Sequence, residues 1–593
     1  MNGRRDDLGR AAAALLLAAV VALTAAQHVA FFRYDRRGWV DHDLYYGGAG
    51  LTIARGIEAA CARGRSACVD YFASLATGRS APSIYPPLLN TLQAAWTLIR
   101  GGDPFAYRAV TLAFFLALIL GEYALARVHA RRAFAWLAAF LVATAPVFDN
   151  FSRKFFPQFH VAAILVWSFA LASRASRRKA VTLPEALLFG LLLSAALLVH
   201  PVALLLAAPG VVLFVATAAR QAPRRARAAV GLAIGLLPSA GWYARNLAAY
   251  VAEKGRYLDV QGLHGHYGLS VADQTRRAVV RWAYTVCWNY PGKALVVAAA
   301  IAGIAAVADA VRPSAPPRAG RRFFLAATAY YLAAGLWIAV HDGLLHDTLI
   351  VIAVVAAWAA MELDQLARRL WGDGRWRRAA LLACFGGLLV AGAWDKAAAP
   401  ASECSWEDHR LTISNCYHTF RSVWPSPDPA AGIVSAIRDA AAGPSFALTV
   451  YEVRVERGRG AIAPAEPHGA EALRSSVARE AERFGLELRD DAPARFAAWY
   501  SVADTRAAAT NEDQTYRALL AAVGEARGWR GLHAFVTDAG YPYGADRSTV
   551  MAELVARTDG GGRADERGST PGTAARAGSP GQGTVKAAGV LTP

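Results

Sequence analysis

Long apolar runs separated by short polar connections dominate the first 395 residues of this 593-residue chain. An α-helix needs about 20 predominantly apolar residues to cross the hydrocarbon core of a bilayer. Several runs are shorter than that, so their ends are approximate. The predicted spans are 11–32, 109–126, 133–148, 155–173, 183–199, 202–219, 229–244, 294–311, 323–340, 348–363 and 379–395. We therefore expect a mainly α-helical, polytopic membrane protein with about eleven transmembrane helices.

Basic residues gather in the connections between alternate spans. Cytoplasmic loops of membrane proteins carry an excess of Lys and Arg, and this excess sets the orientation of the spans. The clusters contain Arg4, Arg5 and Arg10; Arg127, Arg131 and Arg132; Arg174, Arg177, Arg178 and Lys179; Arg220, Arg224, Arg225 and Arg227; Arg312, Arg318, Arg321 and Arg322; and Arg368, Arg369, Arg375, Arg377 and Arg378. We predict that these six clusters and the N-terminus are cytoplasmic, at the inner membrane.

The intervening segments are then expected outside, together with the C-terminus. They are 33–108, 149–154, 200–201, 245–293, 341–347 and 396–593. The first apolar run also has the flanks of a cleaved signal peptide. A retained first span is favoured, because so many apolar segments follow it.

The formal net charge of +18 is spread over these connections and not gathered on one domain. A nucleic acid is therefore not expected as a partner, whereas membrane lipid is.

Four of the six cysteines lie in segments predicted to be outside, where an oxidising compartment allows disulfides to persist. Cys61 with Cys68, and Cys404 with Cys416, are close enough in sequence to pair locally. Four free thiols are the alternative, and the sequence does not choose between the two.

The first outer segment, 33–108, is far longer than a connection between two spans requires, which favours a functional loop. Apolar residues recur at helical spacing over Asp43–Glu58 and Pro87–Ile99. We expect both stretches to form amphipathic helices along the membrane surface.

The composition changes after Trp394, where alternating residues over Phe446–Val453 and His533–Thr537 predict strands. Helical stretches are expected near 468–486 and 512–527. The domain organisation predicted is therefore a transmembrane domain over 1–395, a small α/β extracytoplasmic domain over 396–559 and a disordered tail over 560–593.

Nucleotide-binding and hydrolase signatures are absent from the sequence: it has no Walker loop, no His-Glu-x-x-His, no Gly-x-Ser-x-Gly and no dinucleotide fingerprint. Nucleotide-driven transport by this chain alone is therefore not expected.

Two carboxylates flank an imidazole just after the first span, at Asp41, His42 and Asp43. A general base needs an ionisable group beside the hydroxyl that it activates, and partial desolvation at the lipid boundary raises a carboxylate's pKa towards the working pH. The alternative is that both acids are solvated loop residues.

The segment Asp41-His42-Asp43-Leu44-Tyr45-Tyr46, followed by Ala49 and Leu51-Thr52-Ile53-Ala54-Arg55-Gly56, resembles the first outer loop of GT-C membrane glycosyltransferases. That group includes protein O-mannosyltransferases, aminoarabinose transferases of lipid A and lipopolysaccharide sugar transferases. Ser83-Ile84-Tyr85-Pro86-Pro87-Leu88-Leu89 is similar to the family's segment before a proline pair. Gly241-Trp242-Tyr243-Ala244-Arg245-Asn246 resembles its Trp-x-x-Arg-Asn motif. The resemblance covers roughly 1–395 and leaves the C-terminal part unexplained.

The resemblance implies an inverting sugar transfer from a polyprenyl-phosphate donor to a lipid, glycan or protein acceptor at the outer face. It also implies an acidic first-loop residue as the base, and both Asp43 and Asp41 match that position. Related enzymes often carry an acid near an arginine after the third span. Here Asp149 precedes Arg153, which departs from the commoner order.

A leaving lipid phosphate must be neutralised, and the basic residues at predicted outer span ends are Arg245, Arg153 and Lys154. The alternative is that they extend to lipid headgroups.

Further residues predicted to line the substrate cavity are His42, Tyr46, Tyr85, Asn246, His341 and His346. No cofactor is assigned. A divalent metal at the loop 341–347 is a less favoured alternative, because its spacing matches no established ligand pattern.

Two other functions are compatible with many spans and charged outer loops. A transporter or flippase of lipid-linked sugars would carry polar residues through the middle of several spans. A non-catalytic membrane protein of envelope assembly would leave the first-loop acids dispensable. The polar residues concentrate at predicted outer ends, which favours the enzyme.

Overall fold

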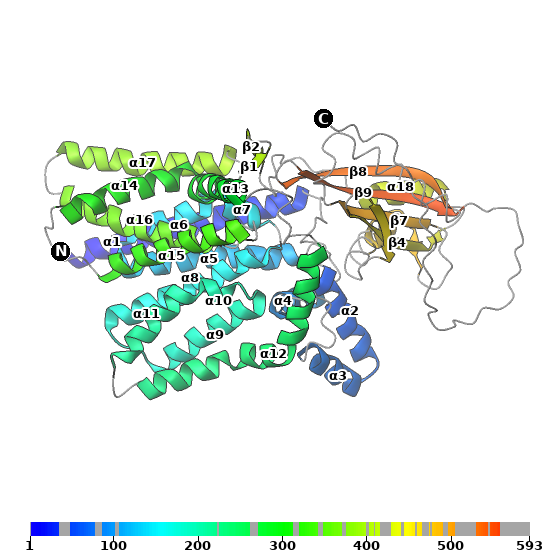
Figure 1. Ribbon diagram of the computed structural model, residues 1–593, viewed down its shortest axis with the longest axis horizontal. Coiled ribbons are helices and arrows are strands. Elements are labelled where there is room, and N and C mark those ends of the chain that lie inside the picture. Colours follow the sequence, from blue (N-terminus) through cyan, green and yellow to red (C-terminus); the bar gives the residue numbers. More distant parts are fainter. Residues whose placement is uncertain are drawn as a thin grey trace, which may run out of the picture.

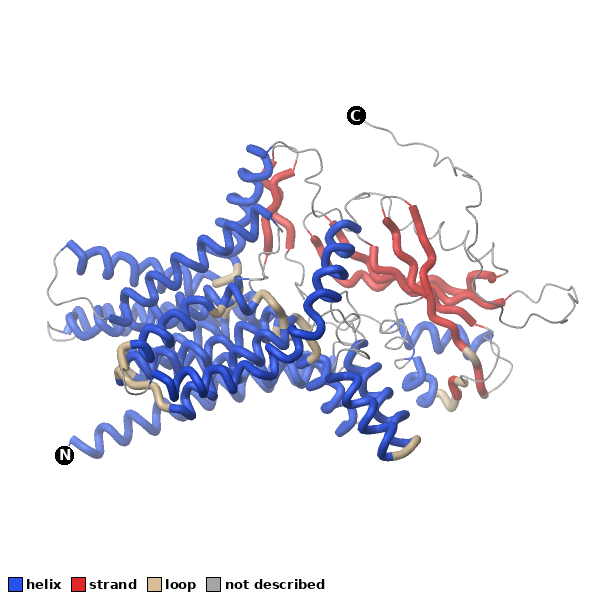
Figure 2. The backbone as a smooth tube through the Cα atoms, turned by 60° about the horizontal axis from the view of Figure 1, so that its bottom comes forward, coloured by secondary structure: helices blue, strands red, loops and turns tan. Residues whose placement is uncertain are grey.

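The structure is a computed structural model, and it places helices and strands over most of the chain (Figure 1). The described residues are 2–34, 48–76, 86–100, 106–153, 155–221, 225–260, 271–311, 319–341, 348–370, 375–398, 402–407, 410–415, 429–440, 444–456, 459–464, 474, 477–489, 496–503, 529–543 and 546–557. A helical domain lies at one side of the molecule and a β-rich part at the other, as Figure 2 shows.

The helical domain consists of helices, most of them long, that lie alongside one another (Figure 1). They are α1 (Asn2–Tyr34), α5 (Ala106–His129), α6 (Arg132–Thr144), α8 (Pro157–Arg178), α9 (Leu183–Val199), α10 (Ala203–Leu206), α11 (Ala208–Ala219), α12 (Arg225–Val260), α14 (Gly292–Val311), α15 (Ala319–His341), α16 (Ile350–Leu370) and α17 (Arg375–Ala398). Shorter helices connect them: α7 (Pro146–Phe151), α13 (Val271–Tyr284) and a π-helical segment (Thr285–Asn289).

Six helices in the described part of the chain are long and apolar enough to cross a membrane. They contain Ala11–Ala30, Tyr107–His129, Pro157–Arg178, Gly292–Asp309, Ile350–Leu370 and Ala379–Lys396. Shorter apolar helices overlap the predicted spans 133–148, 183–199 and 202–219, the last of which is divided between α10 and α11. The prediction of a mainly helical, multi-pass membrane protein is therefore confirmed, while the count of eleven spans stays a prediction.

Several of the predicted basic clusters meet at one end of the helical domain, here called the basic end. It is formed by the N-termini of α6 and α15 and the C-termini of α14 and α16. The Arg131 backbone N–H donates to Asp364 at 3.1 Å, and Arg321 donates to Asp309 at 2.6 Å. Arg177 bonds the Val128 carbonyl. Connections far apart in the sequence thus share one side, as the charge pattern predicts.

The helices α9 and α12 pack backbone to backbone. A Cβ atom added to Gly190 would lie 2.6 Å from the Leu232 carbonyl oxygen, and one added to Gly235 would lie 2.5 Å from the Leu187 carbonyl oxygen. Pro238 interrupts the hydrogen bonding inside α12 because it has no N–H. α12 continues to Val260, well beyond the end of the predicted span 229–244.

We expect Gly235→Ala to destabilise the protein by about 1–3 kcal/mol, because the new methyl group overlaps the α9 backbone. Gly241→Ala is the matched control on the same helix, since no atom lies within 4 Å of its added Cβ. It is expected to stabilise α12 by about 0.5–1 kcal/mol. Scanning fluorimetry of the purified variants in detergent measures both, and equal melting temperatures would contradict the close packing.

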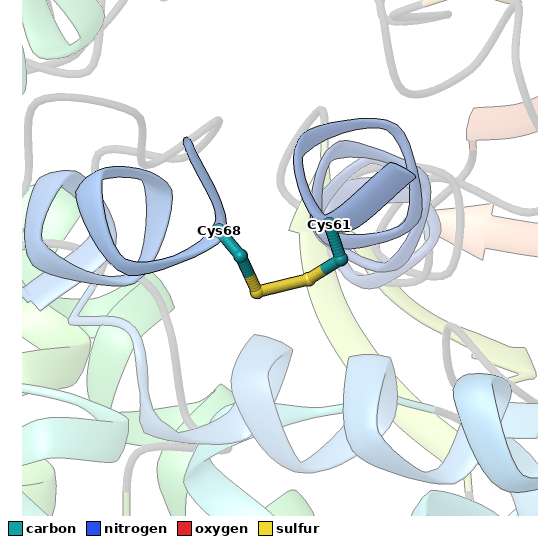
Figure 3. The surroundings of a disulfide bond; sticks show 2 residues. All are labelled: Cys61 and Cys68. Carbon is teal, nitrogen blue, oxygen red and sulfur yellow. A yellow bond between two sulfur atoms is a disulfide. The ribbon is translucent and has the colours of Figure 1, made fainter. Parts of the chain in front are cut away.

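Three helices form within 33–108: α2 (Gly48–Ala62), α3 (Arg65–Ala76) and α4 (Leu88–Arg100). α2 and α4 overlap the helices predicted over Asp43–Glu58 and Pro87–Ile99. A disulfide joins Cys61 to Cys68 with their Cα atoms 4.4 Å apart (Figure 3). One of the two candidate pairings is thus present, and the other involves Cys416, which lies outside the described residues.

α4 buries several polar residues beside Leu89 and Ala94 and exposes several apolar ones. Asn90, Gln93 and Thr97 are buried, whereas Leu92 is exposed and Ile99 is 74% exposed. An apolar outer face is what a helix lying against a bilayer presents to lipid.

The C-terminal part contains a five-stranded sheet with strand order β5-β4-β7-β9-β8. Its strands are β4 (Leu448–Glu456), β5 (Arg459–Pro464), β7 (Phe496–Ala503), β8 (Trp529–Tyr543) and β9 (Asp546–Arg557). Smaller elements are the hairpin of β1 (Ser402–Glu407) and β2 (Arg410–Asn415), the parallel pair of β3 (Ser445–Phe446) and β6 (Glu487–Leu488), and the helix α18 (Pro429–Ala440).

The strands predicted over Phe446–Val453 and His533–Thr537 fall within these elements, and residues 477–483 are helical as expected. The predicted helix 512–527 and the tail 560–593 lie outside the described residues.

Candidate functional site

The predicted site residues divide into described and undescribed ones. Outside the described residues lie Asp41, His42, Asp43, Tyr46, Tyr85, Lys154 and His346. His341 is the last residue of α15, and its side chain lies outside the description as well. The described ones are Arg153, Arg245 and Asn246. Asp149, four residues before Arg153, is considered with them.

The Trp-x-x-Arg-Asn segment is one continuous stretch of α12. The Tyr243 hydroxyl donates to the Leu197 carbonyl oxygen of α9 at 2.9 Å, and Trp242 is buried beside it. The Asn246 amide donates to the Trp242 carbonyl oxygen at 2.9 Å, and Arg245 is exposed. The two aromatic residues thus anchor the helix, and Arg245 lies on its accessible surface near the C-terminus of α9.

Asp149 and Arg153 form an ion pair at the opposite end of the domain from the basic end. This end, here called the α7 end, comprises α7, the N-termini of α5, α8 and α14 and the C-terminus of α17 (Figure 1). Arg153 Nη2 lies 2.6 Å from Asp149 Oδ2, with both side chains mostly buried. Lys396 Nζ, from the last turn of α17, lies 2.9 Å from the other carboxylate oxygen, Oδ1. One carboxylate therefore joins two cations.

The pKa of the Asp149 carboxyl is held well below its usual range. Burial alone would raise that pKa, but the positive charges of Arg153 and Lys396 act in the opposite direction and outweigh it. Asp149 is therefore an ionised carboxylate whose oxygens both accept charged hydrogen bonds.

α7 is also tied to α1 and to Tyr290, the residue that follows the π-helical segment. His28 Nε2, from the first span, lies 2.6 Å from Ser152 Oγ, and the Ser152 hydroxyl lies 2.9 Å from the Asp149 carbonyl oxygen. His28 Nδ1 donates to the Thr24 carbonyl oxygen at 2.9 Å. The Val147 N–H donates to the Tyr290 carbonyl oxygen at 3.4 Å. A six-residue helix is thereby fixed from several sides.

Phenylalanine rings surround this polar cluster. The buried rings are Phe115, Phe148, Phe151, Phe155, Phe156 and Phe159. The Lys396 ammonium lies 5.6 Å from the centroid of the Phe115 ring. Apolar surroundings strengthen the hydrogen bonds inside the cluster, because water competes less for the charged groups.

A third cation, Arg108, is buried at the N-terminus of α5. Its Nε donates to the Tyr107 hydroxyl at 3.3 Å, and its guanidinium carbon lies 5.5 Å from the Phe32 ring centroid. The Tyr107 ring packs 5.6 Å from Phe155, and the Phe32 ring 5.9 Å from His28. Arg108 thus belongs to the same end of the domain as the Asp149 cluster.

Sequence reasoning identified Arg153 and noted Asp149, but it passed over Lys396, His28 and Arg108. The hydropathy pattern ends the last predicted span at residue 395, which places Lys396 at the start of the C-terminal segment. A usable signal was present, since ionisable residues inside or at the edge of apolar runs mark functional positions in membrane proteins.

The described residues contain no group of three or more His, Cys, Asp or Glu that would hold a metal ion. Asp149 is occupied by two cations, so it is poorly suited to bind a metal. The loop 342–347 lies outside the described residues, so the metal alternative at that loop is not tested.

No family model matches the sequence, and no curated protein matches it. The structure is similar to that of the oligosaccharyltransferase AglB from Archaeoglobus fulgidus in complex with an inhibitory peptide and a dolichol-phosphate. The identity is 13%, the match covers 88% of this chain and 73% of that chain, and the TM-score is 0.42. It is also similar to ArnT from Cupriavidus metallidurans bound to undecaprenyl phosphate, at 13% identity over 91% of this chain and 97% of that chain, with a TM-score of 0.45.

Both matched proteins are GT-C glycosyltransferases, the superfamily whose motifs this sequence resembles. With TM-scores below 0.5, the likeness assigns no residue, substrate or orientation to this chain.

Proposed function

We propose that this protein is a membrane glycosyltransferase that moves a sugar from a polyprenyl-phosphate donor to a lipid, glycan or protein acceptor outside the cytoplasmic membrane. Asp43 or Asp41 activates the acceptor hydroxyl, and Arg153 and Arg245 bind the donor phosphate. The C-terminal part, 396–559, is an extracytoplasmic domain that covers the cavity or binds the acceptor.

The observation that carries this proposal is the cationic cluster at the α7 end. Two cations, Arg153 and Lys396, surround Asp149 in apolar surroundings, with Arg108 buried nearby. A lipid-linked phosphate gains negative charge as the glycosidic bond breaks, and fixed cations stabilise that charge most strongly where water is scarce.

The orientation is part of the proposal. Clusters rich in arginine meet at the basic end, which the positive-inside rule assigns to the cytoplasm. The α7 end then faces outward. The disulfide between Cys61 and Cys68 supports this orientation, because such bonds persist in oxidising compartments.

The alternative function is transport of lipid-linked sugars without chemistry. Buried charged groups do occur inside the described helices, among them Glu122 in α5. The ion pairs of the described spans nevertheless concentrate at the ends of the helices and not in their middle. This distribution favours catalysis at a membrane face over a polar path across the membrane.

The experiment is a transfer assay with the purified full chain in nanodiscs. Synthetic undecaprenyl-phosphate hexoses and pentoses with a radiolabelled sugar are the donors, and the envelope fraction of a deletion strain supplies the acceptors. We expect label in the envelope fraction with at least one donor, and none with heat-inactivated protein. Binding of the donors without transfer of any sugar would overturn the enzyme proposal in favour of the transporter.

A further inference from the structure

We infer that Lys396 is a positioning residue: from the end of the last membrane helix it fixes Asp149, and through Asp149 it orients Arg153 for the phosphate of the lipid donor. This inference rests on the proposed function. It assigns a role to a residue 247 positions away from Asp149 in sequence and outside every motif of the chain.

Lys396 is held by two specific contacts. Its Nζ donates to Asp149 Oδ1 at 2.9 Å and to the Ala143 carbonyl oxygen, near the end of α6, at 2.9 Å. Its side chain is 17% exposed, and the Phe115 ring covers one side of the ammonium. A lysine that only extended to lipid headgroups would keep its ammonium in water.

Asp149 divides its two oxygens between the two cations. Oδ2 accepts from Arg153, four residues later, and Oδ1 accepts from Lys396. Hydrogen bonds at both oxygens restrict the rotation of the carboxylate, and this limits the positions open to the guanidinium bonded to it. Without Lys396 the buried Oδ1 loses its charged partner, and the carboxylate regains freedom to turn.

The residue before Lys396 fixes a different element. Asp395 Oδ2 accepts from the Ala294 N–H at 2.8 Å, in the first turn of α14. Consecutive side chains at the end of α17 therefore hold α14 on one side and α7 on the other. Any displacement of this helix end, which leads directly into the C-terminal part, would be transmitted to the Asp149–Arg153 pair.

The test compares phosphate recognition in three variants of the full chain in nanodiscs. The probe is undecaprenyl phosphate, and undecaprenol, which lacks the charge, is the comparison ligand. Lys396→Met is expected to raise the Kd for undecaprenyl phosphate about tenfold and to leave undecaprenol binding unchanged. Lys396→Arg restores a cation and is expected to recover most of the affinity. Lys293→Met is the matched control, because Lys293 is an exposed lysine at the same end of the domain.

A double variant separates position from charge. Lys396→Met removes one positive charge, and adding Asp149→Asn restores the sum without restoring the ion pair. If Lys396 acts by holding Asp149 in place, the double variant is expected to bind undecaprenyl phosphate as weakly as Lys396→Met does. Recovery of wild-type affinity would show that only the summed charge matters and would overturn the inference.

The remaining outcomes are distinct. Unchanged Kd in Lys396→Met overturns the positioning role alone, whereas a wild type that does not bind undecaprenyl phosphate overturns the proposed function and this inference with it. Melting temperatures are measured alongside, and a Lys396→Met protein that does not fold is replaced by Lys396→Gln, which keeps a donor for the Ala143 carbonyl.

Discussion

Replacing Arg321 with Met is expected to destabilise the helical domain by about 3–5 kcal/mol, because it leaves a buried carboxylate without its cation. Arg321 Nε lies 2.6 Å from Glu362 Oε1, and the Glu362 side chain is fully buried. Asp309, the second acid bonded to Arg321, keeps its contact with Arg369 at 2.7 Å. The expected loss of stability therefore comes mainly from Glu362, whose carboxylate is left without a cation. Unfolding of the purified variant in mixed detergent micelles, followed by tryptophan fluorescence, measures it.

Two further variants test this reasoning about Arg321. Arg321→Met with Glu362→Leu replaces the ion pair by an apolar pair and is expected to recover most of the stability. Arg178→Met removes a cation from Glu185, which is partly exposed and keeps its bonds to Thr182, so a loss below about 1 kcal/mol is expected. Equal losses in the two single variants would contradict the role assigned to burial.

The local features of the fold follow from the sequence. Apolar runs predict the long helices, and arginine clusters predict that their connecting ends share a side, which the contact of Arg177 with Val128 illustrates. Helical spacing also predicts α2 and α4, and alternation predicts β4 and β8. Each of these signals depends on residues within one or two turns of one another.

The long-range features do not follow from the sequence. Lys396 contacts Asp149, and His28 contacts Ser152 across 124 residues. Neither pairing can be predicted from the residues that are close to it in sequence. The continuation of α12 to Val260 was missed for a related reason. The apolar pattern of a span stops where the helix leaves the membrane. The helix itself continues beyond that point for as long as its backbone hydrogen bonds and packing support it. The conformations of Asp41 and Asp43 lie outside the described residues, so their role stays a prediction.

The variant Asp41→Asn/Asp43→Asn is expected to lower the rate of sugar transfer by roughly 10²–10⁴-fold, the usual contribution of a general base. An amide cannot take the proton of the acceptor hydroxyl, but it keeps the size of the side chain. Undecaprenyl phosphate binding is expected to change little, because the phosphate lies with Arg153 and Arg245 in the proposed arrangement. The loss should therefore appear in kcat.

The single variants identify which of the two acids is the base, since only that one should reproduce the loss of the double variant. Asp70→Asn is the matched control, because Asp70 is an exposed acid in α3 of the same outer segment. It is expected to transfer sugar at the wild-type rate. Undiminished transfer by Asp41→Asn/Asp43→Asn would remove both acids from the mechanism. A loss in binding as large as the loss in rate would instead mean that they hold the lipid donor and do not activate the acceptor.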